Sequence, residues 1–134
     1  DSLVSEEKES QIKNLKILIA EDDKISEMLI TRLVKKYSNN ILNARNGFEA
    51  IEICNNNPDI DLILMDIQMP KLNGYEATKE IRKFNPEVII IAQTAFGLLG
   101  EKEKVLEIGC NDYLSKPIVK EVLHAMMIKY FETK

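Results

Sequence analysis

Polar side chains that could bind a cation and a phosphoryl group follow four short apolar runs of the sequence. Glu21 and Asp22 come after KILIA, Asp66 after LILM, Thr94 after VIIIA, and Lys116 after DYL. Carboxylates that converge within ~5 Å repel by about 3 kcal/mol per pair at an effective dielectric near 20, so a cation or a retained proton must compensate. Oxygen ligands favour a hard ion such as Mg²⁺, while an ammonium and a hydroxyl suit phosphoryl oxygens. This set is typical of phosphoryl transfer onto a carboxylate, here Asp66, with an acyl phosphate as product.

Each of these residues also has a simpler interpretation. Asp22 or Asp23 could cap the helix that follows, and Asp66 could be a turn residue before Pro70. A lone threonine after a strand usually caps or turns the chain, and a lone lysine is usually solvated. The chemical interpretation therefore depends on elements that bring these residues together.

The apolar runs predict five strands, near residues 16–20, 41–44, 62–65, 88–92 and 112–114. Three of the runs are continuous rather than alternating, which is typical of strands covered on both faces of a parallel sheet. Apolar residues at helical spacing predict five helices between and after the strands. One of them carries Ile25, Met28, Leu29 and Leu33, and the last carries Val119, Val122, Leu123, Met126, Met127 and Tyr130. The alternation favours one α/β domain with helices on both faces of the sheet. In such a sheet ligands bind beyond the carboxyl ends of the strands, where the candidate residues lie.

Length and composition narrow the class of protein. The chain has 134 residues and a net charge of −4, which fits one domain and argues against a broad nucleic-acid-binding surface. We expect residues 1–14 to be a linker or the tail of a preceding segment and residues 15–134 to be the domain. No run reaches the length of a transmembrane helix. Cys54 and Cys110 have apolar surroundings, so we expect both to be reduced thiols in the core. Reduced thiols indicate a cytoplasmic domain, which could also be the cytoplasmic part of a membrane-bound sensor kinase.

Four motifs, ILIAEDD, LILMDIQMPKLNG, QTA and DYLSKP, occur in this order between about residues 15 and 131. Together they make the chain resemble the receiver domain of a two-component response regulator. The resemblance implies a flavodoxin-like fold, with three α/β/α layers and a five-stranded parallel sheet of order 2-1-3-4-5. It implies that Glu21, Asp22, Asp66 and the carbonyl of Gln68 hold Mg²⁺, for which Mn²⁺ or Ca²⁺ can substitute in crystals. Asp66 would accept the phosphoryl group, Lys116 would contact it, Thr94 and Tyr113 would form the switch, and the Lys116–Pro117 bond would be cis.

The resemblance also implies a role in a phosphorelay. The donor would be the phosphohistidine of a histidine kinase or a phosphotransfer domain, because the one histidine, His124, lies beside an apolar stripe and is not expected to be catalytic. The domain would not be a conventional enzyme, although it catalyses its own phosphorylation and dephosphorylation. Glu21, where many receivers carry Asp, and the surrounding motifs look most like receivers of hybrid sensor histidine kinases.

The expected output face is formed by the fourth helix, the fifth strand and the fifth helix, where a downstream protein or a second copy would bind. Phe96, Leu98, Leu99 and Ile128 form a candidate partner patch there, although Leu98 and Leu99 could equally pack under the loop. Phe96 and Gln68 are expected to tune the phosphate lifetime. We expect no contact of this chain with nucleic acid or membrane.

Four alternatives stay open. A haloacid-dehalogenase-type phosphatase also uses an aspartate nucleophile, but it needs an acid where Gln68 stands. A flavin carrier needs a Ser, Thr and Gly-rich phosphate loop where Glu21-Asp22-Asp23 stands. A pseudo-receiver would keep the fold as an interaction module only, and the chain could be a stand-alone response regulator rather than part of a kinase.

Overall fold

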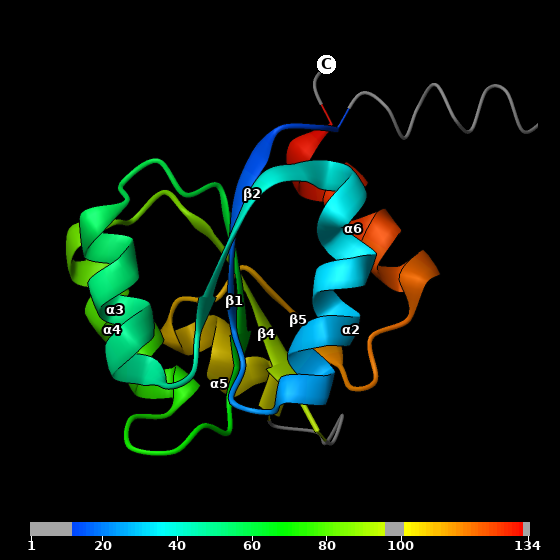
Figure 1. Ribbon diagram of the computed structural model, residues 1–134. Coiled ribbons are helices and arrows are strands. Elements are labelled where there is room, and N and C mark those ends of the chain that lie inside the picture. The colour runs from blue at the N-terminus through cyan, green and yellow to red at the C-terminus, as the bar shows by residue number, and fades with distance from the viewer. Residues whose placement is uncertain (1–11, 96–100, 133–134) are drawn as a thin grey trace, which may run out of the picture.

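A single parallel sheet forms the centre of the molecule in the computed structural model, which describes residues 12–95 and 101–132. The strands in these residues are β1 (Leu15–Ala20), β2 (Ser38–Ala44), β3 (Leu62–Asp66), β4 (Ile89–Thr94) and β5 (Asp112–Ser115). They pair in the order β2-β1-β3-β4-β5, and every neighbouring pair is parallel. The strand order that the resemblance implied is therefore confirmed (Figure 1).

Helices cover both faces of this sheet. In the described ranges they are α2 (Lys24–Val34), the short 3₁₀ helix η1 (Lys35–Tyr37), α3 (Gly47–Asn56), α4 (Gly74–Phe84), α5 (Glu101–Ile108) and α6 (Lys120–Phe131). Figure 1 shows α3, α4 and α5 on one face and α2 and α6 on the other. Each face has its own hydrophobic core, so the predicted three-layer α/β/α architecture is confirmed.

Side chains of the central strands alternate between the two cores. In β1, Leu18 and Ala20 belong to the core under α3, α4 and α5, whereas Ile17 and Ile19 belong to the core under α2 and α6. All residues of β3 are buried, including Asp66 at its end. Two covered faces need apolar side chains at every position, which is why these strands are continuous apolar runs.

The strand boundaries differ from the predicted ones. β2 starts at Ser38, three residues before the predicted start, because an edge strand can pair through its backbone while its side chains stay polar. β4 continues beyond Ala92 to Thr94, which makes Gln93 a buried strand residue.

The prediction of which helix faces are buried is partly wrong. In α2 the core side chains are Ile30 and Val34, while Ile25, Met28 and Leu29 are 69%, 53% and 53% exposed. An amphipathic pattern marks an apolar face without telling whether that face meets the core.

The last helix shows the same effect. Leu123 and Met127 of α6 are core residues, but Val119 and Val122 of the predicted stripe are exposed. Ile128, assigned to a partner patch, packs instead against the core under α2 and α6. Phe96, Leu98 and Leu99 of that patch lie outside the described residues.

The remaining sequence predictions that concern buried groups agree with the fold. Cys54 and Cys110 are buried free thiols. His124 is half-buried, and its Nδ1 lies 2.7 Å from the hydroxyl of Tyr37. The Lys116–Pro117 bond is cis.

Among the described residues, no helix combines the length and the apolar character needed to cross a membrane.

Candidate functional site

Acidic side chains gather at the carboxyl ends of β1 and β3, which are neighbours in the sheet. Carboxylate oxygens of Glu21, Asp22 and Asp66 all lie within 4.8 Å of one another. Glu21 and Asp66 are only 3% exposed, whereas Asp22 is exposed. The convergence follows from topology, because parallel strands end at the same edge.

The adjacent carboxylates Asp22 and Asp23 have different surroundings. Asp23 is the N-cap of α2, and its Oδ2 accepts a hydrogen bond of 2.9 Å from the backbone N–H of Ser26. This bond lowers the pKa of Asp23 below its ordinary value. Asp22 belongs to the acidic cluster. The capping interpretation therefore applies to Asp23.

Lys116 reaches the acidic cluster from beyond β5. Its Nζ lies 2.8 Å from Oε1 of Glu21 and 3.1 Å from Oδ2 of Asp66. Its backbone N–H donates to the carbonyl of Thr94 at the end of β4. The lysine side chain therefore crosses the end of β4 to reach β3 and β1.

The site shifts the proton affinities of its central groups. Burial and, next, the charge of Glu21 raise the pKa of Asp66 from 3.8 to about 6, although Lys116 opposes the shift. Burial lowers the pKa of Lys116, but hydrogen bonds and charges of Glu21 and Asp66 outweigh that effect and raise it. A buried carboxylate with an incompletely compensated charge is a group that a cation would stabilise.

Gly74 sets the position of the Asp66 main chain, and the sequence analysis did not assign it this role. A Cβ at this glycine would overlap the carbonyl oxygen of Asp66. The N–H of Gly74 donates to the carbonyl of Ile67 at 3.0 Å. The first turn of α4 therefore packs directly on the backbone at the end of β3, which only glycine permits.

The other predicted site residues, Gln68, Thr94 and Tyr113, have different surroundings. Gln68 donates its backbone N–H to Oδ1 of Asp66 at 3.1 Å. Thr94 is 1% exposed, and its hydroxyl has no hydrogen-bond partner among the described residues. Tyr113 is half-buried on β5, with Nζ of Lys102 5.8 Å from the ring centroid.

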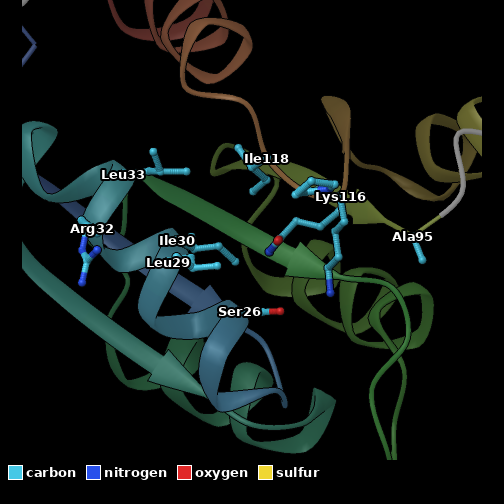
Figure 2. Close-up of a pocket in the computed structure, with 10 residues that line it drawn as sticks. Ser26, Leu29, Ile30, Arg32, Leu33, Ala95, Lys116 and Ile118 are labelled. Atoms are coloured by element: carbon cyan, nitrogen blue, oxygen red, sulfur yellow. The ribbon is translucent and has the colours of Figure 1, made fainter.

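A pocket of about 420 Å³ adjoins the acidic cluster on the α2 side of the sheet. Its walls come from α2, β4 and the segment after β5, and Lys116 is one of its lining residues. Figure 2 shows Leu29, Ile30 and Leu33 facing Lys116 and Ile118. Gln93 also lines it, a polar residue that the sequence analysis passed over because the predicted strand ended before it.

The residues present fit a hard divalent cation. Glu21, Asp22 and Asp66 offer only oxygen atoms, and one exposed and two buried carboxylates leave a solvent side for water or phosphate ligands. One ammonium cannot neutralise three carboxylates, so a cation would balance the charge.

Comparisons with known proteins agree with this geometry. The family model described as response regulator receiver domain matches residues 17–128. The hybrid signal transduction histidine kinase I of Dictyostelium discoideum is 39% identical over 135 residues, which cover 92% of this chain and 8% of that protein. The chain thus spans a small part of the length of this relative.

Two solved structures are similar in both fold and sequence. One is the receiver domain of a sensor histidine kinase from Pseudomonas aeruginosa PAO1 with a magnesium ion in its active site cleft. It has a TM-score of 0.80 and 33% identity, covering 90% of this chain and 99% of that one. The other is a Saccharomyces cerevisiae receiver domain of a downstream response regulator, crystallised with a histidine phosphotransfer protein. It has a TM-score of 0.81 and 34% identity, covering 89% and 90%.

Proposed function

Because the chain belongs to the response regulator receiver domain family, we propose that Asp66 accepts a phosphoryl group from a phosphohistidine. The observation that carries this proposal is the convergence of three carboxylates and Lys116 at one sheet edge. The proposed donor is a histidine kinase or a histidine phosphotransfer domain. A similar receiver is bound to such a phosphotransfer protein, which supports this class of donor.

In the proposed reaction, an oxygen of the Asp66 carboxylate attacks phosphorus, and the bond from phosphorus to the donor imidazole nitrogen breaks. The imidazole leaves with that electron pair and the acyl phosphate remains on Asp66. Lys116, already 3.1 Å from Asp66, would contact the phosphoryl oxygens. Glu21, Asp22, Asp66 and the carbonyl of Gln68 would hold Mg²⁺, which supplies positive charge for the transferring oxygens. Water later hydrolyses the acyl phosphate, which releases inorganic phosphate and regenerates the Asp66 carboxylate. The domain is thus the substrate of its own phosphorylation rather than a conventional enzyme.

Phosphorylation would change the conformation through Thr94 and Tyr113. The new group adds about 1.5 to 2 negative charges and three acceptor oxygens. The buried Thr94 hydroxyl, which lacks a partner in the described residues, can donate to one of them. Tyr113 can then turn toward the space that Thr94 leaves, which shifts the population between two packings. The proposed output face for a downstream protein or a second copy is formed by α5, β5 and α6.

The exposed stripe of α2 is the proposed docking surface for the donor. Ile25, Met28 and Leu29 are all more than half exposed, and Leu29 also borders the pocket that Lys116 lines (Figure 2). A donor must bring its phosphohistidine into contact with Asp66, so it must cover the surface next to this site. An exposed apolar stripe in that place is typical of a protein interface.

We propose that the whole protein is a hybrid sensor histidine kinase, with residues 1–14 as the link and the receiver in the cytoplasm. Similarity to hybrid kinases supports this assignment, and buried free thiols fit a reducing compartment. A stand-alone response regulator is the second candidate, because a response regulator that is 36% identical to this chain is matched over 84% of its own length.

The decisive experiment is incubation of the chain with acetyl phosphate and Mg²⁺, followed by intact mass spectrometry. We expect one added phosphoryl group, absent in Asp66→Asn and lost when the cation is chelated. Modification of Asp66→Asn, or modification without a divalent cation, would contradict the assigned site. No modification of the native chain would favour a pseudo-receiver, and continuous turnover of a phosphate ester would favour a phosphatase.

A further inference from the structure

Gln93 is a buried polar side chain with no visible structural purpose. It is 0% exposed, and within the described part of the chain neither its Oε1 nor its Nε2 has a hydrogen-bond partner. Its neighbours in β4 along the same face belong to an apolar core, for example Ile91. A buried amide without partners destabilises a fold, so such a group calls for an explanation.

The location of Gln93 suggests that explanation. In the sheet it pairs with Asp66, and because paired residues of neighbouring strands share a face, both side chains project toward the α2 and α6 side. Gln93 and Lys116 line the same pocket. Lys116 starts from the carbonyl of Thr94 and ends at Asp66, so its side chain passes over the strand end that carries Gln93.

The lysine needs an acceptor that does not compete with a cation. An ammonium has three donors, and two acceptors of Lys116 are Glu21 and Asp66. These carboxylates are also the proposed ligands of the cation. A bound cation would therefore compete with the lysine for these carboxylate oxygens and weaken their hydrogen bonds to its ammonium. The carbonyl oxygen of an uncharged carboxamide is a weaker ligand for the ion but a good acceptor for an ammonium.

We propose that Gln93 is a positioning residue for Lys116. When the cation binds Glu21 and Asp66, Oε1 of Gln93 accepts a hydrogen bond from the ammonium of Lys116. This bond keeps the ammonium beside Asp66, the proposed phosphoacceptor. This inference rests on the proposed function, because it assigns Gln93 a role in the same phosphorylation. The unpaired buried amide is then the cost of having this acceptor available.

The first test replaces the amide by an apolar group of similar length, Gln93→Met. In chelator we expect a higher melting temperature, since two unpaired buried polar atoms are removed. With Mg²⁺ and acetyl phosphate we expect about tenfold slower phosphorylation, the loss that corresponds to one hydrogen bond to a charged group. Thr31→Val is the matched control: it also removes a buried unpartnered oxygen, and it should leave the phosphorylation rate unchanged. A native rate in Gln93→Met would overturn the proposal.

A double-mutant cycle tests whether Gln93 acts through the lysine. In a Lys116→Ala background, Gln93→Met should cause no further loss of rate, because the residue that it positions is absent. The same tenfold loss in both backgrounds would show that Gln93 acts independently of Lys116.

A second readout needs no phosphorylation. Reductive methylation of Lys116, followed by peptide mass spectrometry, reports how firmly its amine is held. In chelator, the native chain and Gln93→Met should react equally, because the carboxylates hold the lysine. With Mg²⁺, Lys116 should be methylated faster in Gln93→Met. Equal rates with Mg²⁺ would refute the proposal even if the native chain accepted no phosphoryl group, so the two failures are distinguishable.

Discussion

At the scale of single residues, Asp66 combines two properties that oppose each other. A nucleophile must be a carboxylate, but burial and the neighbouring Glu21 favour its protonated form and raise its pKa to about 6. Lys116 compensates only in part. The residue that the proposed function needs charged is thus the one whose charge the fold disfavours, a conflict expected at functional sites.

This conflict predicts that Asp66→Asn stabilises the chain when no divalent cation is present. The pKa is higher in the folded chain than the ordinary 3.8, so the folded state binds the proton more tightly between about pH 4 and 6. The native chain therefore loses stability as pH rises through that window. At pH 8 we expect Asp66→Asn to be more stable by about 1 to 2 kcal/mol, a value reduced for partial solvation and for the lost ion pair.

Urea unfolding in chelator at pH 5 and pH 8 measures this difference. The advantage of Asp66→Asn should shrink at pH 5, where the native carboxyl is largely protonated. An advantage that is equal at both pH values, or a destabilised variant at pH 8, would contradict the assigned environment of Asp66.

Sequence reasoning found most of the charged residues of the site, because strand ends are visible in the apolar pattern. From the residues alone it could not distinguish Asp22 from Asp23, since the direction of each side chain depends on the backbone turn after β1; the family resemblance assigned Asp22 to the site. It also missed Gln93 and Gly74. The burial of Gln93 depends on where β4 ends. The role of Gly74 depends on a close approach between α4 and β3.

At the scale of elements, Arg82 connects the end of α4 with the start of β4 and with a turn that is distant in the sequence. Its Nε donates to the carbonyl of Gly109 at 2.8 Å, and its Nη1 to the carbonyls of Val88 at 2.7 Å and Asn85 at 3.1 Å. Its Nη2 donates to Oδ1 of Asn111 at 2.8 Å. The guanidinium thereby ties the end of α4 to the start of β4 and to the turn between α5 and β5. This fixes one end of α5, part of the proposed output face.

We predict that Arg82→Met destabilises the fold by about 2 to 3 kcal/mol, because it leaves backbone carbonyls without their charged donor. The adjacent Lys83→Met is the matched control. Lys83 forms an exposed ion pair with Glu80, three residues earlier, so its loss should change stability by at most about 0.5 kcal/mol. Urea denaturation of both variants decides the matter, and equal stabilities would remove the structural role of Arg82.

Helix faces were harder to predict than strands. A strand covered on both faces has a continuous apolar run, so its burial follows from the pattern alone. α2 instead has two apolar faces, one with Ile30 against the core and one with Ile25 and Met28 exposed. Periodicity cannot separate a core face from a docking face, because the same residue types serve both.

At the scale of the whole molecule, the sheet brings residues from the four strand ends to one edge. The apolar runs predicted parallel strands, but not which strands are neighbours, since burial does not encode pairing. The order with β1 and β3 adjacent came from the family resemblance. This adjacency places Glu21 and Asp66 side by side, so a cation bound between them would be linked to the stability of the entire fold.

That linkage gives a prediction for the folded chain. A cation that binds only the folded state stabilises it, by about 2.7 kcal/mol at a concentration one hundred times its Kd. We therefore expect the melting temperature to rise by several degrees when Mg²⁺ replaces chelator. The rise should be lost in Asp22→Asn, which removes a carboxylate from the cluster without disturbing a buried residue.

The adjacent Asp23→Asn provides the control, because it removes the same charge one residue later. Asparagine caps helices about as well as aspartate, so the cap on Ser26 persists and the response to Mg²⁺ should remain. If both variants lose the response equally, the effect is a general consequence of negative charge near the sheet edge. If only Asp22→Asn loses it, three specific carboxylates couple the cation to the fold, because charge alone is equal in the two variants.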